Sequence, residues 1–162
     1  MLNRRQLIAS SLVAAAASPS LARAAERRTP LDRAAYDRYV TLFNAEDPRF
    51  TDLYADDVQF LMGIKGKSGV LAFYGRQRPY VKETLEVEFF CSDAGGAAAE
   101  VRGTMRCYND CSDPSIFGQP VKAGQVQVMH GYLLYLLDAR GKIAVIKGSR
   151  PEVLQPWDSS LR

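Results

Sequence analysis

Residues 125–137, QVQVMHGYLLYLL, constrain the fold most, because apolar side chains occupy most positions of both alternating sets. A run of this kind is typical of a strand that is covered on both faces of a sheet. The tight-turn sequence DARG follows at 138–141, and a second apolar segment follows at 143–147. Turn and segment together predict a hairpin, with 125–137 as the central strand of the sheet.

The first 24 residues have the features of an export signal. Arg4 and Arg5 precede an apolar stretch that is too short to anchor in a bilayer, and the stretch ends in the small-x-small pattern of a cleavage site. The sequence NRRQLI resembles a twin-arginine signal. We therefore expect cleavage after Ala24, one mature domain over 25–162 and a location in the periplasm. The alternative is an amphipathic helix that belongs to the fold, which the lack of a polar face disfavours.

The charge balance argues against a nucleic-acid partner. The formal net charge is +3, but Arg4, Arg5 and Arg23 lie in the leader, which has no acidic residue. The rest of the chain has 18 basic and 18 acidic side chains. A nucleic-acid-binding surface needs an excess of basic side chains. We expect no nucleic-acid partner, and no segment after the leader is apolar enough to span a membrane.

The three cysteines are Cys91, Cys107 and Cys111. Two of them can pair in an oxidising compartment, and Cys107 with Cys111 is the expected disulfide because it closes a short loop. Cys91 with Cys107 is the alternative if their strands are neighbours. The set lacks the CxxC spacing of a metal site. Phosphate-binding glycine loops, nucleophile elbows and haem motifs are also missing, so we expect neither a metal nor a cofactor.

Local patterns place helices before strands. Helical signals mark 31–44, 48–54 and 70–75, strands are expected at 58–62, 84–92 and 97–108, and 109–124 is a polar loop. Leu85, Val87, Phe89 and Cys91 alternate with polar residues and predict one apolar face. The tail from Pro151 contains two prolines and is expected to be irregular. Helices followed by antiparallel strands indicate an α+β domain, whose curved sheet would enclose a pocket.

Four phrases resemble the nuclear-transport-factor-2-like superfamily, which includes ketosteroid isomerase and the SnoaL-type polyketide cyclases. They are YVTLF at 39–43, LYADDV at 53–58, GKSGVLAFY at 66–74 and YLLDARGKI at 135–143. The resemblance implies a cone-shaped α+β fold, in which a curved antiparallel sheet wraps around N-terminal helices, with an internal pocket and often a dimer. Because these phrases form turns and packing positions, they specify fold better than function.

The resemblance also suggests site residues. Tyr39 matches the position of the isomerase's oxyanion tyrosine, and His130 falls about where the isomerase has its hydrogen-bond-donating aspartate. The base aspartate is missing, because Met62 falls at its position. The last strand, around 146–149, lacks the acid of the superfamily's epoxide hydrolases. Steroid isomerisation and epoxide hydrolysis by those mechanisms are therefore disfavoured.

His130, the only histidine, is the leading candidate for acid/base catalysis. Tyr39 and Tyr132 are candidates for binding an oxyanion, and Tyr132 shares a strand face with His130. The alternative is a core histidine bonded to a tyrosine. Arg150 is a candidate anchor for an anionic group, with a solvated charge as the alternative. The expected apolar lining of the pocket is Phe60, Met62, Phe89, Val128 and Leu134.

These observations favour an exported, cofactor-free enzyme of the lyase or isomerase type. It would move protons on a small apolar molecule of the aromatic or polycyclic kind. The alternative is a non-catalytic periplasmic module that binds a small molecule or a protein partner. The resemblance favours a homodimer in either case.

Overall fold

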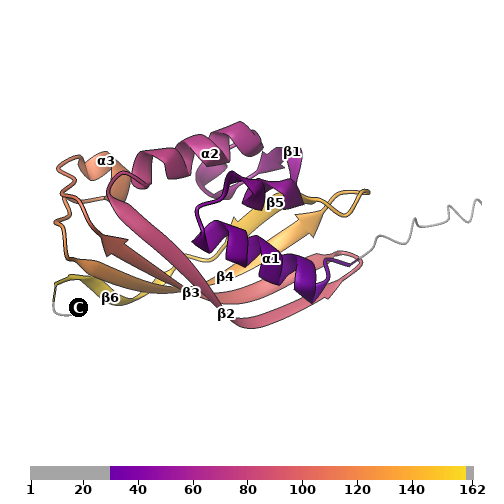
Figure 1. Ribbon diagram of the computed structural model, residues 1–162. Helices are drawn as coiled ribbons and strands as arrows, with labels where there is room; N and C mark the ends of the chain where they lie inside the picture. The colour runs from indigo at the N-terminus through magenta and orange to yellow at the C-terminus, as the bar shows by residue number, and fades with distance from the viewer. Residues whose placement is uncertain (1–29, 160–162) are drawn as a thin grey trace, which may run out of the picture.

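The computed structural model describes residues 30–159, which form a curved six-stranded sheet with helices packed on its concave side (Figure 1). The strand order is β1-β5-β4-β3-β2, and β6 pairs with β4 beside β5. The helical elements are α1 (Arg33–Asn44), η1 (Pro48–Leu53), η2 (Leu61–Gly63), α2 (Gly66–Gln77) and α3 (Pro114–Phe117). The strands are β1 (Tyr54–Gln59), β2 (Val81–Asp93), β3 (Gly96–Cys107), β4 (Val126–Leu137), β5 (Ile143–Gly148) and β6 (Glu152–Asp158). The predicted α+β class is confirmed, and the predicted leader, 1–24, lies outside the described residues.

Strand β4 lies at the centre of the sheet, as predicted. β3 pairs with it along almost its whole length, and its other edge is shared by two strands. β5 forms the predicted hairpin with the half that ends at Leu137, and β6 pairs with the half that begins at Val126. The expectation of an irregular tail after Pro151 is wrong, because proline is tolerated on an edge strand such as β6.

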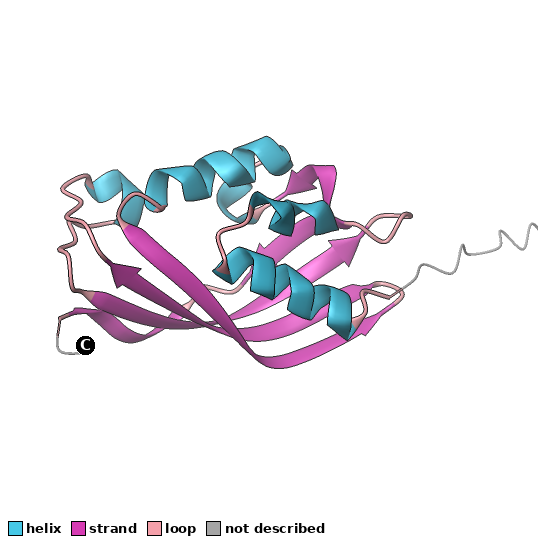
Figure 2. Cartoon of the chain, in the orientation of Figure 1, coloured by secondary structure: helices cyan, strands magenta, loops and turns pink. Residues whose placement is uncertain are grey.

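The two faces of β4 differ in their cover. Tyr135 and Leu137 are buried against the helices. On the other face, Tyr132 is 56% exposed and Leu134 is 43% exposed. The expectation that β4 is covered on both faces is wrong, because the described helices pack on one side of the sheet only (Figure 2).

A β-bulge in β2 changes which residues face the core. The register shifts between Val87 and Phe89. After the shift Phe90 packs against the core and stacks on Tyr36 with ring centroids 4.5 Å apart, whereas Phe89 is 55% exposed. The regular alternation predicted over 84–92 therefore fails at this point, because one extra residue moves all later side chains to the opposite face.

Helix α1 lies within 31–44, where the sequence predicts a helix, and it buries one apolar face. Asp32 caps its first turn by accepting hydrogen bonds from the backbone N–H groups of Ala34 and Ala35. Four residues at helical spacing, Tyr36, Tyr39, Val40 and Phe43, are buried against the sheet. Helix α2 covers Gly66–Gln77 and is longer than the predicted 70–75. Within 30–159, no helix combines the length and apolar character needed to cross a membrane.

Pairs of tyrosine hydroxyls connect α1 to the strands. The hydroxyl oxygens of Tyr36 and Tyr135 are 2.7 Å apart, and those of Tyr39 and Tyr54 are 2.9 Å apart. Both pairs are buried, so each hydroxyl is satisfied by its partner rather than by water. Burial raises the pKa of Tyr36 to about 12, and it also raises that of Tyr39. All four phenols therefore stay neutral at ordinary pH and can act only as hydrogen-bonding groups.

Gly96 is required by a close approach of two strands. A Cβ added there would lie 2.3 Å from the carbonyl oxygen of Tyr135. We expect Gly96→Ala to lower the free energy of unfolding by about 1–3 kcal/mol, measured by urea denaturation. Gly75→Ala in α2 is the matched control, because its added Cβ would meet nothing within 4 Å. Equal urea midpoints for Gly96→Ala and the unmodified protein would contradict this account.

Cys107 and Cys111 lie in a second small core with Val81 and Val121. Both are free thiols in this structure, so the disulfide between them stays a prediction for the oxidised protein. The alternative pairing with Cys91 is excluded by register. Cys107 lies opposite Val81 on β2, whereas Cys91 lies ten residues further along β2, about 33 Å away.

Candidate functional site

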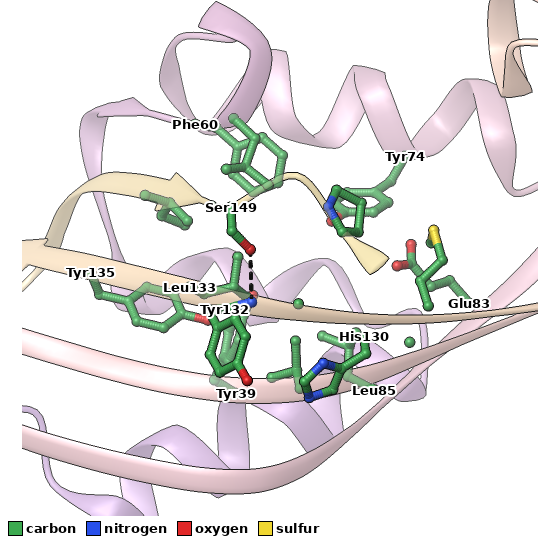
Figure 3. A pocket seen from close by; sticks show the side chains of 18 residues that line it. Tyr39, Phe60, Tyr74, Glu83, Leu85, His130, Tyr132, Leu133, Tyr135 and Ser149 are labelled. Carbon is green, nitrogen blue, oxygen red and sulfur yellow. Dashed lines mark hydrogen bonds between the residues drawn. The ribbon is translucent and has the colours of Figure 1, made fainter. Parts of the chain in front are cut away.

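A cavity of about 140 Å³ lies between the concave face of the sheet and the helices (Figure 3). Its lining is mainly aromatic and aliphatic. From the helical side and the loops come Tyr39, Phe60, Leu61 and Tyr74, and from the strands come Glu83, Leu85, Val101, Met129, Leu133, Tyr135 and Ile146. Tyr39, the candidate oxyanion residue, and Phe60, a candidate lining residue, are thus both in the wall of this cavity.

Two glycines leave room for this cavity. Gly103 on β3 and Gly131 on β4 both line it. A Cβ on Gly103 would meet Glu83 and Leu85 at 3.8 Å and the backbone oxygen of Met129 at 4.0 Å, all ordinary contact distances. A Cβ on Gly131 would meet only Pro151, at 3.9 Å. The absence of side chains at these inward positions, rather than backbone strain, makes the sheet hollow here.

Glu83 is the acidic residue among the side chains that line the cavity. It lies on β2 opposite Met105, on the inner face. Among the described residues its carboxyl has no hydrogen-bond or ion-pair partner. Burial among apolar neighbours raises its pKa from 4.5 to about 7, because the charged form loses hydration. A carboxyl that exchanges its proton near neutral pH, with both oxygens free, is suited to general acid/base work.

The hydroxyl of Tyr74 is the second free polar group of the cavity wall. No hydrogen bond from it to a described residue is present. In 30–159, every fully enclosed side-chain polar atom has a partner, so this hydroxyl is not fully enclosed, and Tyr74 is part of the cavity wall. Burial, with a smaller contribution from the charge of Glu83, raises the pKa of Tyr74 well above 10. Tyr74 therefore presents a neutral phenol that can donate to a developing oxyanion.

Comparison with known proteins identifies the fold. No family model matches the sequence, and no curated protein matches it. Solved structures do. A proposed polyketide cyclase of Pseudomonas putida KT2440 is 25% identical, with 71% of this chain and 87% of that chain covered and a TM-score of 0.59. A ketosteroid isomerase of a Mycobacterium species is 18% identical, with 74% and 95% covered and a TM-score of 0.55. This is the nuclear-transport-factor-2-like fold.

A third match within the nuclear-transport-factor-2-like fold is a SnoaL-like polyketide cyclase of Agrobacterium tumefaciens C58. It is 18% identical, with 72% of this chain and 87% of that chain covered and a TM-score of 0.55. The superfamily predicted from the four sequence phrases is therefore confirmed. At these identities the comparison establishes the shape of the chain, and the chemistry has to be argued from the side chains.

His130 and Tyr132 line the pocket, but their polar atoms are engaged on the outer face of the nuclear-transport-factor-2-like sheet. The imidazole Nε2 lies 2.9 Å from Glu100 Oε1 and 3.3 Å from Glu88 Oε2. The Tyr132 hydroxyl donates to the same Glu100 oxygen at 3.1 Å. Figure 3 shows both rings on the side of β4 away from Phe60 and Tyr74. The expectation that His130 faces the interior is wrong, because strand alternation turns Met129 and Gly131 inward instead.

The other predicted lining residues are distributed over the molecule. Met62 is 76% exposed and lines a different cavity at the open end of the sheet. Phe89, Val128 and Leu134 lie on the outer face, so their expected contact with the interior is wrong. The bulge explains Phe89, and the alternation that turns His130 outward explains the other two. Arg150 is exposed in the link between β5 and β6 and lines neither interior cavity.

The outer-face cluster of Glu88, Glu100 and His130 has ligand atoms within 4.8 Å of one another, which is close enough to share a metal ion. The cluster is already satisfied without one. Arg102 Nε donates to Glu88 at 3.0 Å, and Tyr132 donates to Glu100. We interpret it as an ion-pair network that holds β2, β3 and β4 together on the exposed side.

This placement gives a testable expectation for His130. We expect His130→Gln to leave proton-transfer activity nearly unchanged and to lower the free energy of unfolding by about 1–3 kcal/mol, because Glu88 and Glu100 lose their shared partner. Activity and urea denaturation measured on the same preparation check both parts. A folded variant with normal stability and no activity would restore the predicted catalytic role.

The inward direction of Glu83 could have been predicted from the alternation of residues along β2. Glu83, Leu85 and Val87 are spaced by two, so Glu83 shares the apolar face of β2, whereas Glu86 is on the opposite side. An acidic residue in phase with buried positions is a candidate for a perturbed pKa. Tyr74 carried no such signal, because an aromatic residue on an apolar helix face most often packs in the core.

Proposed function

We propose that this protein is an enzyme of the isomerase, cyclase or lyase type that moves a proton on a small apolar molecule, with Glu83 as general base. The observation that carries the proposal is the unpartnered Glu83 carboxyl in the wall of an apolar cavity, with its pKa raised to about 7. The structural neighbours named as polyketide cyclases and as a ketosteroid isomerase support the same class of reaction.

The proposed reaction needs one base and one hydrogen-bond donor. Ionised Glu83 removes a proton from a carbon next to a carbonyl group, and the electron pair of the broken C–H bond moves into an enolate. The Tyr74 hydroxyl donates a hydrogen bond to the enolate oxygen. Protonated Glu83 then returns the proton to the same or another carbon. Positioned acid/base groups of this kind contribute roughly 10²–10⁴-fold to a rate.

In this proposal Tyr39 supports the oxyanion. Its hydroxyl oxygen is 2.9 Å from that of Tyr54, and either of the two can be the donor. When Tyr54 donates to Tyr39, the Tyr39 hydroxyl is left free to donate into the cavity. The oxyanion role predicted for Tyr39 is thus part of the proposal, with Tyr54 as its positioning residue.

The proposal is tested by deuterium exchange. We expect the protein in D₂O to catalyse incorporation of deuterium next to the carbonyl group of apolar ketones, from cyclohexanone to 2-tetralone, followed by proton NMR. Because the ionised carboxyl is the active form, the rate should rise with pH through an apparent pKa near 7 rather than near 4.5. Exchange no faster than in buffer for the whole panel would contradict the proposal.

We also propose that residues 1–24 direct export to the periplasm by the twin-arginine route. Replacing Arg4 and Arg5 together by lysine is expected to retain the protein in the cytoplasm of a Gram-negative host, because the paired arginines are the feature that the route reads. Cell fractionation and immunoblotting measure this. Export that continues unchanged would point to the general secretory route.

The homodimer that the resemblance implied is likewise a proposal, and light scattering tests it by measuring the mass of the protein in solution.

A further inference from the structure

A second cavity, of about 510 Å³, lies at the open end of the sheet between α2, α3 and the strands β3 and β4. Figure 1 shows α2 extending over the sheet toward α3 at this end. The function proposed above makes no use of this cavity. Its apolar lining consists of Met62, Ile64, Phe73, Met105, Ile116, Phe117 and Met129.

The two cavities lie along one trough on the inner face of the sheet. On β4, Leu133 and Gly131 line the inner cavity, Met129 lines both, and Gln127 lines the outer one. On β3, Gly103 lines the inner cavity and Met105 the outer one. Leu133 and Gln127 are six residues apart on one strand, which is about 20 Å. Met129, a flexible side chain, therefore separates two chambers of a single elongated site.

Size favours a ligand that occupies both chambers. Ligand-binding pockets usually have volumes of roughly 300–1,000 Å³. The outer chamber, at about 510 Å³, falls within this range, whereas the inner cavity, at about 140 Å³, is too small for it, so a ligand that reaches the inner cavity needs room in the outer chamber as well. A molecule whose reacting end reaches Glu83 would extend past Met129 into the outer chamber.

Charge distinguishes the two ends of the trough. The inner chamber holds Glu83, which repels an anion once it is ionised. The outer chamber is lined by Arg76, which is exposed at the end of α2 and forms no ion pair within 30–159. The charge of Arg76 acts on Asp113, whose pKa is lowered first by its hydrogen bonds with Ser115 and least by Arg76. The Arg76 guanidinium is thus free to bind a carboxylate.

We propose that the substrate is an elongated apolar molecule with a carboxylate at one end. The carboxylate pairs with Arg76 in the outer chamber, the apolar chain passes Met129, and the reacting carbonyl end lies beside Glu83 and Tyr74. The position of the reacting end rests on the proposed function, whereas the outer chamber and its cation stand on their own geometry.

Binding is tested with linear carboxylates as probes. Trp157 is the only tryptophan, and its ring centroid lies 5.7 Å from that of Phe117, so its fluorescence reports on the outer chamber. We expect decanoate to bind at least about tenfold more tightly than hexanoate, because four more methylene groups are buried. We expect Arg76→Ala to weaken decanoate about tenfold and to leave 1-decanol unchanged, with Arg76→Lys restoring part of the loss.

Arg106→Ala is the matched control, because Arg106 is an exposed arginine on the outer face of β3, next to Met105. It should leave all three probes unchanged. Equal affinities for hexanoate and decanoate, or equal losses in Arg76→Ala and Arg106→Ala, would overturn the proposal. These titrations need no turnover. A failure of deuterium exchange with normal decanoate binding therefore refutes the proposed function alone, and the reverse result refutes only this inference.

Discussion

Glu83→Gln is expected to reduce the rate of deuterium exchange by about 10²–10⁴-fold while the protein stays folded. The amide has nearly the shape of the carboxyl but cannot accept a proton. Glu86→Gln is the matched control, because Glu86 is an exposed carboxylate of the same strand that faces outward, opposite Arg102. An exchange rate in Glu83→Gln equal to that of Glu86→Gln would rule Glu83 out as the base.

The same substitution is expected to stabilise the folded protein above pH 7. The folded-state pKa of Glu83, about 7, lies above the unfolded value of 4.5. Below pH 4.5 the carboxyl is protonated in both states and costs nothing. Between pH 4.5 and about 7 the unfolded state is ionised and the folded state is not, so stability falls as the pH rises. Above the folded pKa both states are ionised and the loss levels off at up to about 3 kcal/mol. Glu83→Gln removes this loss of stability. Urea denaturation of the variant and the unmodified protein at pH 4 and pH 8 measures the difference.

Gly103→Leu is expected to abolish the activity by filling the inner cavity. Gly103 lies on the cavity floor, and its Cβ position meets nothing closer than 3.8 Å, so a larger side chain grows into empty space. The cavity of about 140 Å³ has no room for both a leucine side chain and a substrate. Because Gly103 is in a strand interior, the variant should be at least as stable as the unmodified protein in urea.

Gly103→Ala provides the graded comparison, since a single methyl group takes up only part of the cavity. Exchange activity should fall in the order Gly, Ala, Leu, with melting temperatures that do not fall in parallel. A folded Gly103→Leu variant that retains full exchange activity would show that the reaction takes place elsewhere on the molecule.

The order of elements could be predicted from sequence because it depends on local signals. The DARG turn and the two apolar runs beside it specify the hairpin of β4 and β5. The helical spacing of apolar residues over 31–44 specifies α1. The superfamily followed from phrases such as LYADDV, which encode turns and packing. Each of these signals is complete within about a dozen residues.

The inner face of β4 could not be predicted in the same way. Both alternating sets of β4 are apolar, so a period of two gives no preference between the set with His130 and the set with Tyr135. The choice is made by long-range contacts, above all the hydroxyl pair of Tyr135 with Tyr36 on α1. The bulge before Phe89 is invisible for a similar reason, because pairing with β3 defines it.

Some residues of the candidate site could be predicted from the sequence, and others could not. Tyr39 and Phe60 were found from the resemblance and from apolar character, and both line the cavity. Glu83 was not predicted, because its inward direction follows only from its spacing of two from Leu85 and Val87 on β2. The outer ion-pair network needed three strands in register, which one sequence does not reveal.

The central claim is that the Glu83 carboxyl faces an apolar cavity without a charged or hydrogen-bonding partner. A carbon-13 NMR titration of the side-chain carboxyl groups, with Glu83 assigned by its absence in Glu83→Gln, tests this claim without knowledge of the substrate. We predict a midpoint near pH 7 for Glu83. A midpoint between about 4 and 5, the range of a solvated glutamate, would contradict the account.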